Sequence, residues 1–480
     1  MVRFLLNNEP VELQVDDPNL TVLRYLREQK SRCGTKEGCG AGDCGACTVV
    51  VATPTPEGDQ LDYRTINSCI SLMSSLHGKQ LITVENLGEA QSLHPVQQAM
   101  VDNHGSQCGF CTPGFIMSAF ALYHSSKTID REEAIHALSG NLCRCTGYRP
   151  IIDAALSACA HRQPDQFDKQ QAQTLKALAA LNAESSNQKA TSLLMPKNRL
   201  ELGQAINTHP EAKLVAGSTD LALEITQGQK QFQTLISLSQ MAELKQIEKS
   251  NNALQIGAMA PLNEVATAIT ASYPELEELF TRFASLPIRN QATLGGNIAN
   301  ASPIGDTPPL MLALEANLVL DNGEQSRTLP AREFFTGYRQ TALAQNEWIS
   351  QVVLPCKLAN QQVSAYKISK RHEDDISAVC AVFSLVIENN VIKKLKTGFG
   401  GVAATPVACL ELEQALLGLN WSDPTCVTLG KGILADAFSP IDDVRATAAY
   451  RKQVLANLWH RFWLEHQTDN QIPTRVVSHA

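Results

Sequence analysis

The residues with the most specific chemistry are eight cysteines in the first third of the chain, which fall into two groups. The first group has the spacing C-x4-C-x2-C with a fourth cysteine further on, and comprises Cys39, Cys44, Cys47 and Cys69. This is the plant-type pattern for a [2Fe–2S] cluster. The second group comprises two close pairs, Cys108, Cys111, Cys143 and Cys145. Two one-electron centres in one chain indicate a protein that transfers electrons.

The loop around the first group suits a cluster, which needs converging thiolates and N–H donors near its sulfides. The loop contains Gly38, Gly40, Gly42 and Gly45, and glycine allows the backbone to fold around the cluster with positive φ. Zinc fits poorly, because zinc sites usually combine two short cysteine pairs. The second group fits zinc or iron–sulfur by spacing alone, and its position directly after a ferredoxin-like segment favours a second cluster.

The elements that must position these cysteines change character along the chain. Alternating and amphipathic patterns predict strands at 2–6, 11–15 and 48–52 and a helix at 21–29. The period then becomes helical, with helices expected at 115–123, 131–138 and 150–159. The second cysteine group falls at the turns between these helices. A polar stretch rich in Gln, Asn, Ser and Ala follows, and predicts a linker that carries a helix at 173–182.

From about residue 193 strands and helices mix again. An apolar run at 213–217 ends in Gly-Ser-Thr-Asp, and 286–306 is expected to be a long loop. Longer strands are predicted at 378–387 and 394–399, and helices at 409–417 and 441–465. The turns at 217–220 and 295–297 could approach a phosphate through backbone N–H groups. There is no G-x-G-x-x-G after a strand, so a Rossmann dinucleotide site is not supported.

Composition bounds the class of protein. The chain has 480 residues and a net charge of −8, which predicts two to four domains and neither nucleic acid nor an anionic membrane as partner. The N-terminal apolar run is too short for a secretory signal, and no stretch reaches the length of a membrane span. The fourteen cysteines therefore indicate metal ligation in a reducing, cytoplasmic compartment rather than disulfides.

Three longer motifs, at 38–48, 108–114 and 141–150, resemble the iron–sulfur domains of the molybdenum hydroxylases, and most closely those of the xanthine dehydrogenases. The resemblance implies that Cys39, Cys44, Cys47 and Cys69 bind one cluster and that Cys108, Cys111, Cys143 and Cys145 bind the other. It also implies a β-grasp ferredoxin-like domain over 1–84 and a helical [2Fe–2S] bundle domain over 85–160.

The resemblance continues to residue 465 and implies an α+β multidomain fold. Residues 214–221 and 294–306 look like the family's two flavin-binding segments, and 329–339 and 371–376 also match. The implied arrangement is a linker over 161–192, a two-part α+β FAD-binding domain over 193–360 and an α+β C-terminal flavoprotein domain over 361–465.

By matching position, the resemblance implies a set of FAD contacts. They are Leu214, Val215, Gly217, Ser218, Thr219, Asp220, Thr293, Gly296, Asn297, Asp306 and Lys367. Phe283 falls where the family stacks an aromatic ring on the isoalloxazine. Asp374 falls on the mobile loop beside the flavin, where it is expected to influence access of the nicotinamide.

The implied function is electron transfer in purine oxidation, with hypoxanthine or xanthine as substrate. Electrons would pass from a molybdenum site through two [2Fe–2S] clusters to FAD and on to NAD+. The chain resembles the small subunit of a bacterial two-subunit xanthine dehydrogenase. The molybdopterin is therefore expected on a separate large subunit, in a heterotetramer of two small and two large subunits.

Two other functions stay open. The chain could serve a related molybdenum hydroxylase that acts on an aldehyde or another N-heterocycle. It could also be a non-enzymatic iron–sulfur electron carrier whose flavin domain is inactive. A visible spectrum separates these classes, since bound flavin absorbs apart from the clusters.

Overall fold

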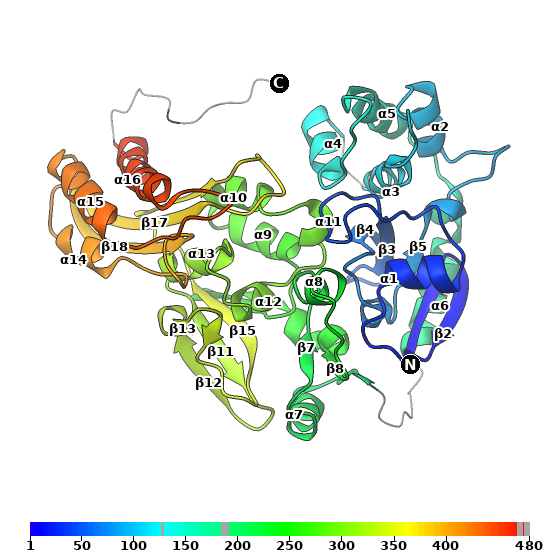
Figure 1. The fold of residues 1–480 in the computed structure, drawn as a ribbon, viewed down its shortest axis with the longest axis horizontal. Helices are drawn as coiled ribbons and strands as arrows, with labels where there is room; N and C mark the ends of the chain where they lie inside the picture. The colour runs from blue at the N-terminus through cyan, green and yellow to red at the C-terminus, as the bar shows by residue number, and fades with distance from the viewer. Residues whose placement is uncertain (126–128, 184–191, 468–473, 475–480) are drawn as a thin grey trace. The chain divides into compact units, whose positions relative to one another are not determined.

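The computed structural model describes residues 1–125, 129–183, 192–467 and 474 (Figure 1). The chain forms two compact units. The first comprises Met1–Ala242 and Ala284–Ala292, and the second comprises Glu243–Phe283 and Thr293–Ala480. Among the helices that the structure describes, none has the length and apolar character needed to cross a membrane.

A mixed five-stranded sheet in the order β2-β1-β5-β3-β4 begins the first unit. Its strands are β1 (Val2–Leu6), β2 (Glu9–Leu13), β3 (Thr48–Pro54), β4 (Leu61–Asn67) and β5 (Gln80–Ile82). Only the pairing of β1 with β5 is parallel. The strands predicted at 2–6 and 48–52 are confirmed. Strand β2 begins two residues earlier than predicted, because Asn7 has a φ of +57° and closes a tight turn.

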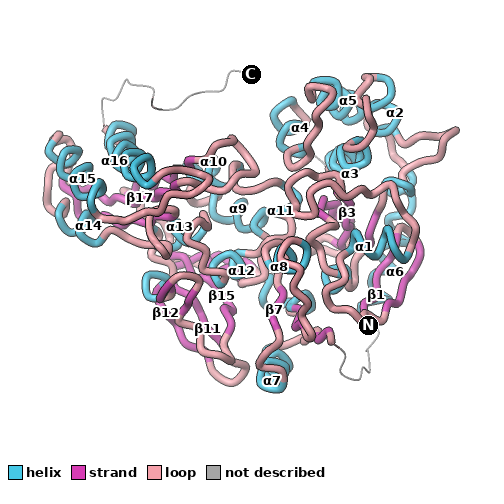
Figure 2. The backbone as a smooth tube through the Cα atoms, viewed as in Figure 1, coloured by secondary structure: helices cyan, strands magenta, loops and turns pink. Residues whose placement is uncertain are grey.

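Four helices make up the next part of the first unit (Figure 2). They are α2 (Pro95–Asp102), α3 (Thr112–Tyr123), α4 (Arg131–Leu138) and α5 (Arg149–Ala160). The three helices predicted here are confirmed. Helix α4 begins where predicted because Asp130 and Glu133 form a reciprocal capping box. The helix predicted at 21–29 is present as α1 (Val22–Arg24), which continues as a π-helical turn over Tyr25–Gln29.

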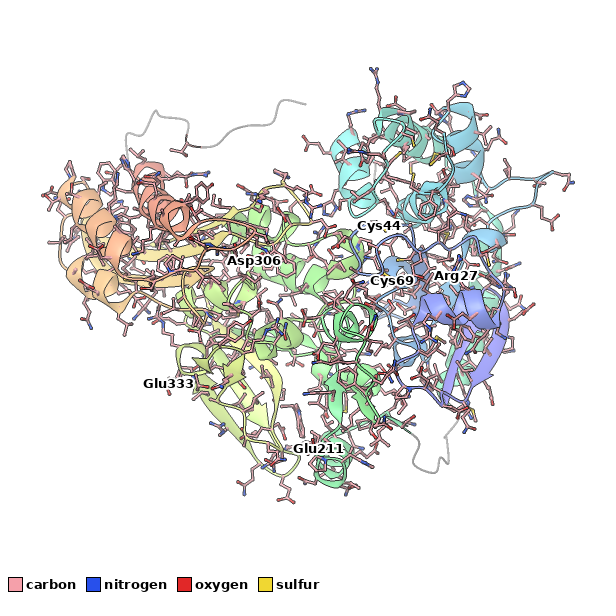
Figure 3. All side chains as sticks on the ribbon, viewed as in Figure 1. Arg27, Cys44, Cys69, Glu211, Asp306 and Glu333 are labelled. Carbon is pink, nitrogen blue, oxygen red and sulfur yellow. The ribbon has the colours of Figure 1, made fainter. Side chains whose placement is uncertain are left out.

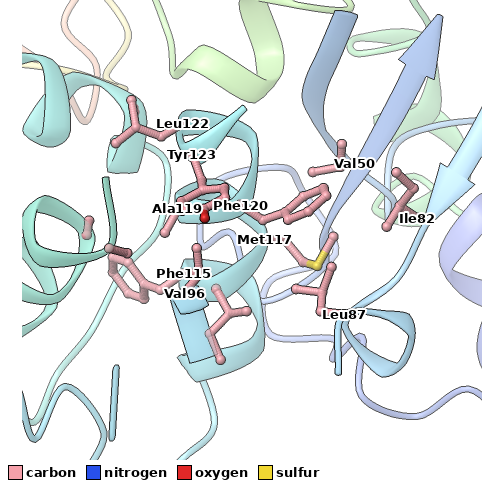
Figure 4. Packing of buried hydrophobic residues seen from close by; sticks show 14 of the residues in the cluster. Val50, Ile82, Leu87, Val96, Phe115, Met117, Ala119, Phe120, Leu122 and Tyr123 are labelled. Carbon is pink, nitrogen blue, oxygen red and sulfur yellow. The ribbon is translucent and has the colours of Figure 1, made fainter. Parts of the chain in front are cut away.

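The sheet and these helices share one hydrophobic core (Figure 4). Phe120 of α3 is completely buried in the same cluster as Val50 of β3 and Ile82 of β5. The interval predicted to be a linker contains α6 (Gln166–Ala183), which is longer than the predicted helix. Helix α6 adds Phe167 and Leu178 to this core. Residues 184–191 of that interval lie outside the described residues.

The first unit also contains a three-stranded parallel sheet in the order β6-β8-β7. Its elements are β6 (Leu193–Leu194), α7 (Arg199–Thr208), β7 (Lys213–Val215), α8 (Leu221–Thr226) and β8 (Leu235–Ser237). The short helix α11 (Leu286–Arg289) returns to the first unit. Strand β7 confirms the prediction of a strand before the Gly-Ser-Thr-Asp turn.

The second unit contains a five-stranded antiparallel sheet and a three-stranded meander. The larger sheet comprises β12 (Ser326–Pro330), β11 (Asn317–Asp321), β15 (Trp348–Pro355), β10 (Ala253–Gly257) and β9 (Ile247–Lys249), in that order. The meander comprises β16 (Gln361–Ile368), β17 (Val379–Glu388) and β18 (Val391–Gly400). The helices of the second unit include α9 (Leu262–Thr270), α10 (Glu277–Thr281), α13 (Thr307–Ala313), α14 (Leu410–Ala415), α15 (Thr425–Asp436) and α16 (Ala448–Glu465).

The expectation of a long loop at 286–306 is wrong. This stretch contains α11 in the first unit and α12 (Leu294–Ala299) in the second. Helix α12 forms because the hydroxyl of Thr293 accepts a hydrogen bond from the N–H of Gly296, which caps the first turn. Gly295 and Gly296 lie within α12 and made a helix hard to predict there, since glycine disfavours helix interiors. The fold as a whole is an α+β multidomain fold, as predicted.

Candidate electron-transfer sites

The first cysteine group comes from two loops of the mixed sheet, and Figure 3 labels one cysteine from each, Cys44 and Cys69. Cys39, Cys44 and Cys47 lie in the loop before β3, and Cys69 follows β4. The sulfur atoms of Cys47 and Cys69 are 3.3 Å apart. The sulfur of Cys39 is within hydrogen-bonding distance of those of Cys44 and Cys69. The four sulfur atoms therefore meet in one place, as a cluster requires.

The backbone of this loop turns N–H groups toward sulfur. The N–H groups of Ala41 and Cys44 donate to the sulfur of Cys39 at 3.3 and 3.4 Å. Gly40, Gly42 and Gly45 have the positive φ that was expected, and Gly38 does not. The position of Gly45 also has no room for a side chain. A Cβ on Gly45 would lie 2.2 Å from the carbonyl oxygen of Gly140.

The four thiols of the first group have pKa values that are shifted in different directions. Hydrogen bonds from Cys44 and Cys69 hold the pKa of Cys39 far below its usual value. The bond to Cys39 raises the pKa of Cys44, and the bonds to Cys39 and Cys47 raise that of Cys69. The bond to Cys69 lowers the pKa of Cys47. Thiolate, the form that binds iron, is thus favoured at Cys39 and Cys47.

The second cysteine group lies at the ends of helices in the bundle. Cys108 and Cys111 precede α3, and Cys143 and Cys145 lie between α4 and α5. The thiol of Cys108 is hydrogen-bonded to that of Cys145, and the thiol of Cys111 to that of Cys143. Cys108 and Cys145 are exposed to solvent. The second set of four sulfurs therefore also converges, at the surface of the first unit.

Local hydrogen bonds favour thiolate at Cys143. Burial acts to raise the pKa of Cys143, but hydrogen bonds from the hydroxyl and N–H of Thr146 and from the N–H of Cys145 outweigh it. The resulting pKa is about 7. A thiol with such a pKa is substantially ionised near neutral pH and is ready to bind a metal.

The loops that carry the two groups are hydrogen-bonded to each other. The N–H of Leu142, next to Cys143, donates to the carbonyl oxygen of Cys44 at 3.0 Å. The buried amide of Asn141 donates to the carbonyl oxygen of Gly45 and to the hydroxyl of Thr48, both at 3.0 Å. Sequence reasoning assigned no role to Asn141, because its partners lie more than 90 residues away. These bonds hold the two loops in direct contact.

The predicted FAD contacts in the first unit lie at the end of β7. The chain passes from Leu214 and Val215 through Gly217 and Ser218 to Thr219 and Asp220, where α8 begins. Ser218 has a φ of +60°, a conformation that a non-glycine residue rarely adopts. Its hydroxyl donates to the carbonyl oxygen of Ile70 at 2.8 Å. The turn is thereby attached to the loop that follows Cys69.

The remaining predicted FAD contacts belong to the second unit. Thr293, Gly296 and Asn297 lie at the start of α12, Asp306 precedes α13, and Phe283 is 9 % exposed. The side-chain oxygen of Asn297 accepts a hydrogen bond from Thr307 at 2.5 Å. These roles toward FAD, like those in the first unit, stay predictions.

Lys367 and Asp306, which sequence reasoning placed in the same set, form a buried ion pair. The Nζ of Lys367 is 2.7 Å from a carboxylate oxygen of Asp306 and 2.8 Å from the hydroxyl of Ser377. That hydroxyl is also 2.5 Å from the other oxygen of Asp306. Ser377 was missed by sequence reasoning, since a lone serine before a strand carries no recognisable pattern.

Replacing Lys367 by methionine is expected to destabilise the second unit by about 3–5 kcal/mol, because it leaves a buried carboxylate without its cation. Thermal unfolding of the Lys367→Met protein measures this. Lys370→Met is the control, since Lys370 is exposed and its Nζ contacts only a backbone carbonyl among the described bonds. Adding Asp306→Asn to Lys367→Met should recover part of the loss. Equal midpoints of thermal unfolding for Lys367→Met and Lys370→Met would contradict the prediction.

Asp374 lies in an exposed loop before β17. It has a φ of +49°, and its carbonyl oxygen accepts a hydrogen bond from Arg371 at 2.7 Å. The guanidinium of Arg282, which follows α10, donates to the carbonyl oxygen of His372 and the hydroxyl of Ser369. The loop is thus attached to the body of the second unit, and the role of Asp374 toward nicotinamide stays a prediction.

Four family models match successive parts of the chain. Residues 4–74 match a 2Fe-2S iron-sulfur cluster binding domain, and residues 83–156 match a [2Fe-2S] binding domain. Residues 184–357 match the FAD binding domain in molybdopterin dehydrogenase, and residues 364–466 match the CO dehydrogenase flavoprotein C-terminal domain. These matches support two [2Fe–2S] clusters and FAD, and favour iron–sulfur over zinc at the second cysteine group.

Curated relatives and solved structures agree with these matches. Xanthine dehydrogenase of Emericella nidulans is 32% identical over 99% of this chain and 39% of the relative. The chain thus spans about two fifths of that relative's length. Among solved structures, carbon monoxide dehydrogenase of Hydrogenophaga pseudoflava is 26% identical, with a TM-score of 0.54, over 56% of this chain and 94% of that one. Quinoline 2-oxidoreductase of Pseudomonas putida 86 shares the fold, with a TM-score of 0.53 at 22% identity over 58% of this chain and 98% of that one.

Proposed function

Because the chain belongs to the iron–sulfur and FAD portion of the molybdenum hydroxylases, we propose that it serves a xanthine dehydrogenase. Electrons from oxidation of hypoxanthine or xanthine at a molybdopterin site would pass through two [2Fe–2S] clusters to FAD and then to NAD+. A flavin can accept electrons singly and release a hydride, so it joins one-electron carriers to a nicotinamide.

The observation that carries this proposal is the unbroken contact between the three candidate sites of the first unit. The loop of the second cysteine group is hydrogen-bonded to Cys44 through Leu142. The loop that follows Cys69 is hydrogen-bonded to the predicted flavin turn through Ser218. The order is therefore second group, first group, flavin turn. Contact between these loops supports electron transfer in this order between the centres that they would hold.

We propose a molybdopterin-bearing large subunit as the source of electrons. The second cysteine group is the natural point of entry, because Cys108 and Cys145 are exposed. Exposed apolar side chains accompany it, with Phe110 48 % and Leu142 47 % exposed. Such a patch is typical of a protein–protein interface. The matched carbon monoxide dehydrogenase chain is covered to 94% by 56% of this chain, so that chain holds little beyond the matched part.

The test compares the purified chain with its complex. The chain alone should oxidise NADH with a dye as electron acceptor and fail to oxidise xanthine. Adding the large subunit should produce NAD+ reduction that depends on xanthine. Xanthine oxidation by the chain alone would refute the proposed division between subunits.

The same assay tests the alternative substrate classes. The likeness to carbon monoxide dehydrogenase favours including substrates of other molybdenum hydroxylases, so aldehydes and N-heterocycles are offered to the same complex. Activity with one of these and not with xanthine would support the proposed electron-transfer role and would show that the proposed substrate is wrong. A complex that holds flavin but reduces neither NAD+ nor a dye would favour a non-enzymatic carrier.

A further inference from the structure

Gln291 joins the first cysteine group to the flavin turn. Its Nε2 donates to the carbonyl oxygen of Gly217 at 2.7 Å and lies 2.9 Å from the hydroxyl of Ser218. Its Oε1 is 2.7 Å from the hydroxyl of Ser71. The carboxamide therefore uses both of its N–H bonds and its oxygen. Ser71 is two residues beyond Cys69, so one side chain spans the two loops.

Gln291 is itself held in place. Its N–H donates to the carbonyl oxygen of Ile288 in α11. The neighbouring Asn290 donates to the carbonyl oxygen of Thr65 in β4 at 3.0 Å, and Arg289 is 2 % exposed. The backbone of Gln291 also fits closely against Gly217, where a Cβ would lie 2.1 Å from its carbonyl oxygen. A movement of residues 289–291 with the loop after Cys69 would therefore also displace the flavin turn at 217–218.

The two loops are also in contact without Gln291. The hydroxyl of Ser218 donates to the carbonyl oxygen of Ile70, and Ala222 of α8 belongs to the same hydrophobic cluster as Cys47 and Cys69. Ser71 and Ser218 are 0 % and 6 % exposed, so water cannot easily replace their partners. A shift of Cys69 would thus be transmitted to the flavin turn.

We propose that Gln291 is a positioning residue that makes affinity for FAD depend on occupancy of the first cluster. The inference rests on the proposed cluster and FAD sites. With iron bound, Cys69 is fixed, and Gln291 holds the backbone of residues 217–218 in its binding conformation. Without iron, the 69–71 loop is free to move, and the binding of FAD must supply the cost of ordering both loops. By linkage, FAD also favours the occupied cluster site.

The experiment is a double-mutant cycle in the full-length chain. FAD is titrated into flavin-stripped protein under anaerobic conditions, and flavin fluorescence reports the dissociation constant. The variants are Cys44→Ala, which removes the first cluster, Gln291→Met, and the combination. We expect Cys44→Ala to raise the dissociation constant for FAD about tenfold, a typical coupling between sites. In the Gln291→Met background, Cys44→Ala should have a smaller effect, and what remains is carried by the direct contacts of Ser218 and Ala222. Cys33→Ala, which replaces an exposed cysteine outside both converging sets, is the matched control and should leave the constant unchanged.

A second variant gives a readout that loss of packing would not produce. In Gln291→Glu, a protonated carboxyl can still donate to the carbonyl oxygen of Gly217, whereas a carboxylate only accepts. Its dissociation constant for FAD should therefore rise as pH rises through the carboxyl's titration range, while that of the wild type stays flat over the same range. This arm is independent of whether the methionine variant folds.

The outcomes separate this inference from the proposed function. A wild-type chain without iron or without FAD would refute the proposed function. If the wild type binds both, equal effects of Cys44→Ala with and without Gln291→Met would overturn the role of Gln291. A dissociation constant for Gln291→Glu that matches the wild type at every pH would overturn it as well.

Discussion

Cys44→Ala is expected to remove the first cluster and retain the second, and Cys143→Ala to do the reverse. The two clusters are expected on separate sets of four sulfurs, and each variant removes one sulfur from one set. A [2Fe–2S] cluster needs four ligands, so only the cluster of that set is lost. Iron should fall from about four atoms per chain to about two in each variant, with matching loss of sulfide. Low-temperature electron paramagnetic resonance of the reduced protein should show two rhombic signals in the wild type and one in each variant.

The control for the cysteine variants is Cys33→Ala. Cys33 is exposed and free, and it precedes the first cluster loop without belonging to the converging set. Its replacement should leave both signals and the iron content unchanged. Loss of the first signal in Cys33→Ala, or of both signals in a folded Cys44→Ala protein, would show that the ligand assignment is wrong. Zinc in place of iron at the second group would contradict that half of the prediction.

Gly217→Ala is expected to reduce bound FAD sharply while iron is retained. The added Cβ would lie 2.1 Å from the carbonyl oxygen of Gln291 and 2.9 Å from the Cα of Ala292. Both atoms belong to backbone, so the turn must move. Overpacking of this kind costs about 1–3 kcal/mol. If that cost falls on the binding conformation, the dissociation constant for FAD rises about fivefold to 150-fold.

The ratio of flavin to iron in purified protein measures this effect. Gly432→Ala is the control, because a Cβ on Gly432 of α15 meets nothing within 4 Å. That variant should keep the wild-type ratio. Full flavin retention in Gly217→Ala would argue against FAD contacts at 214–220.

The cysteine groups and most of the elements around them could be predicted from sequence. The spacing of Cys39, Cys44 and Cys47 is local, so it reports the geometry of one loop without knowledge of the fold. The helix at 131–138 was predictable for the same reason, since its capping box lies within four residues. The α+β multidomain class was implied by the resemblance of several long motifs to the molybdenum hydroxylases.

The contacts that join the sites were decided only by tertiary structure. Gln291 and Ser71 are 220 residues apart, and Ser377 and Asp306 are 71 apart. No periodicity or short motif relates residues at such separations. Helix α6 shows the same limit, because its polar composition predicted a linker while Phe167 and Leu178 are buried in the shared core. The spacing of the cysteines is local, so the sequence alone indicates which of them can share a cluster. Hydrogen-bond partners and buried faces are formed only when segments distant in the sequence pack together.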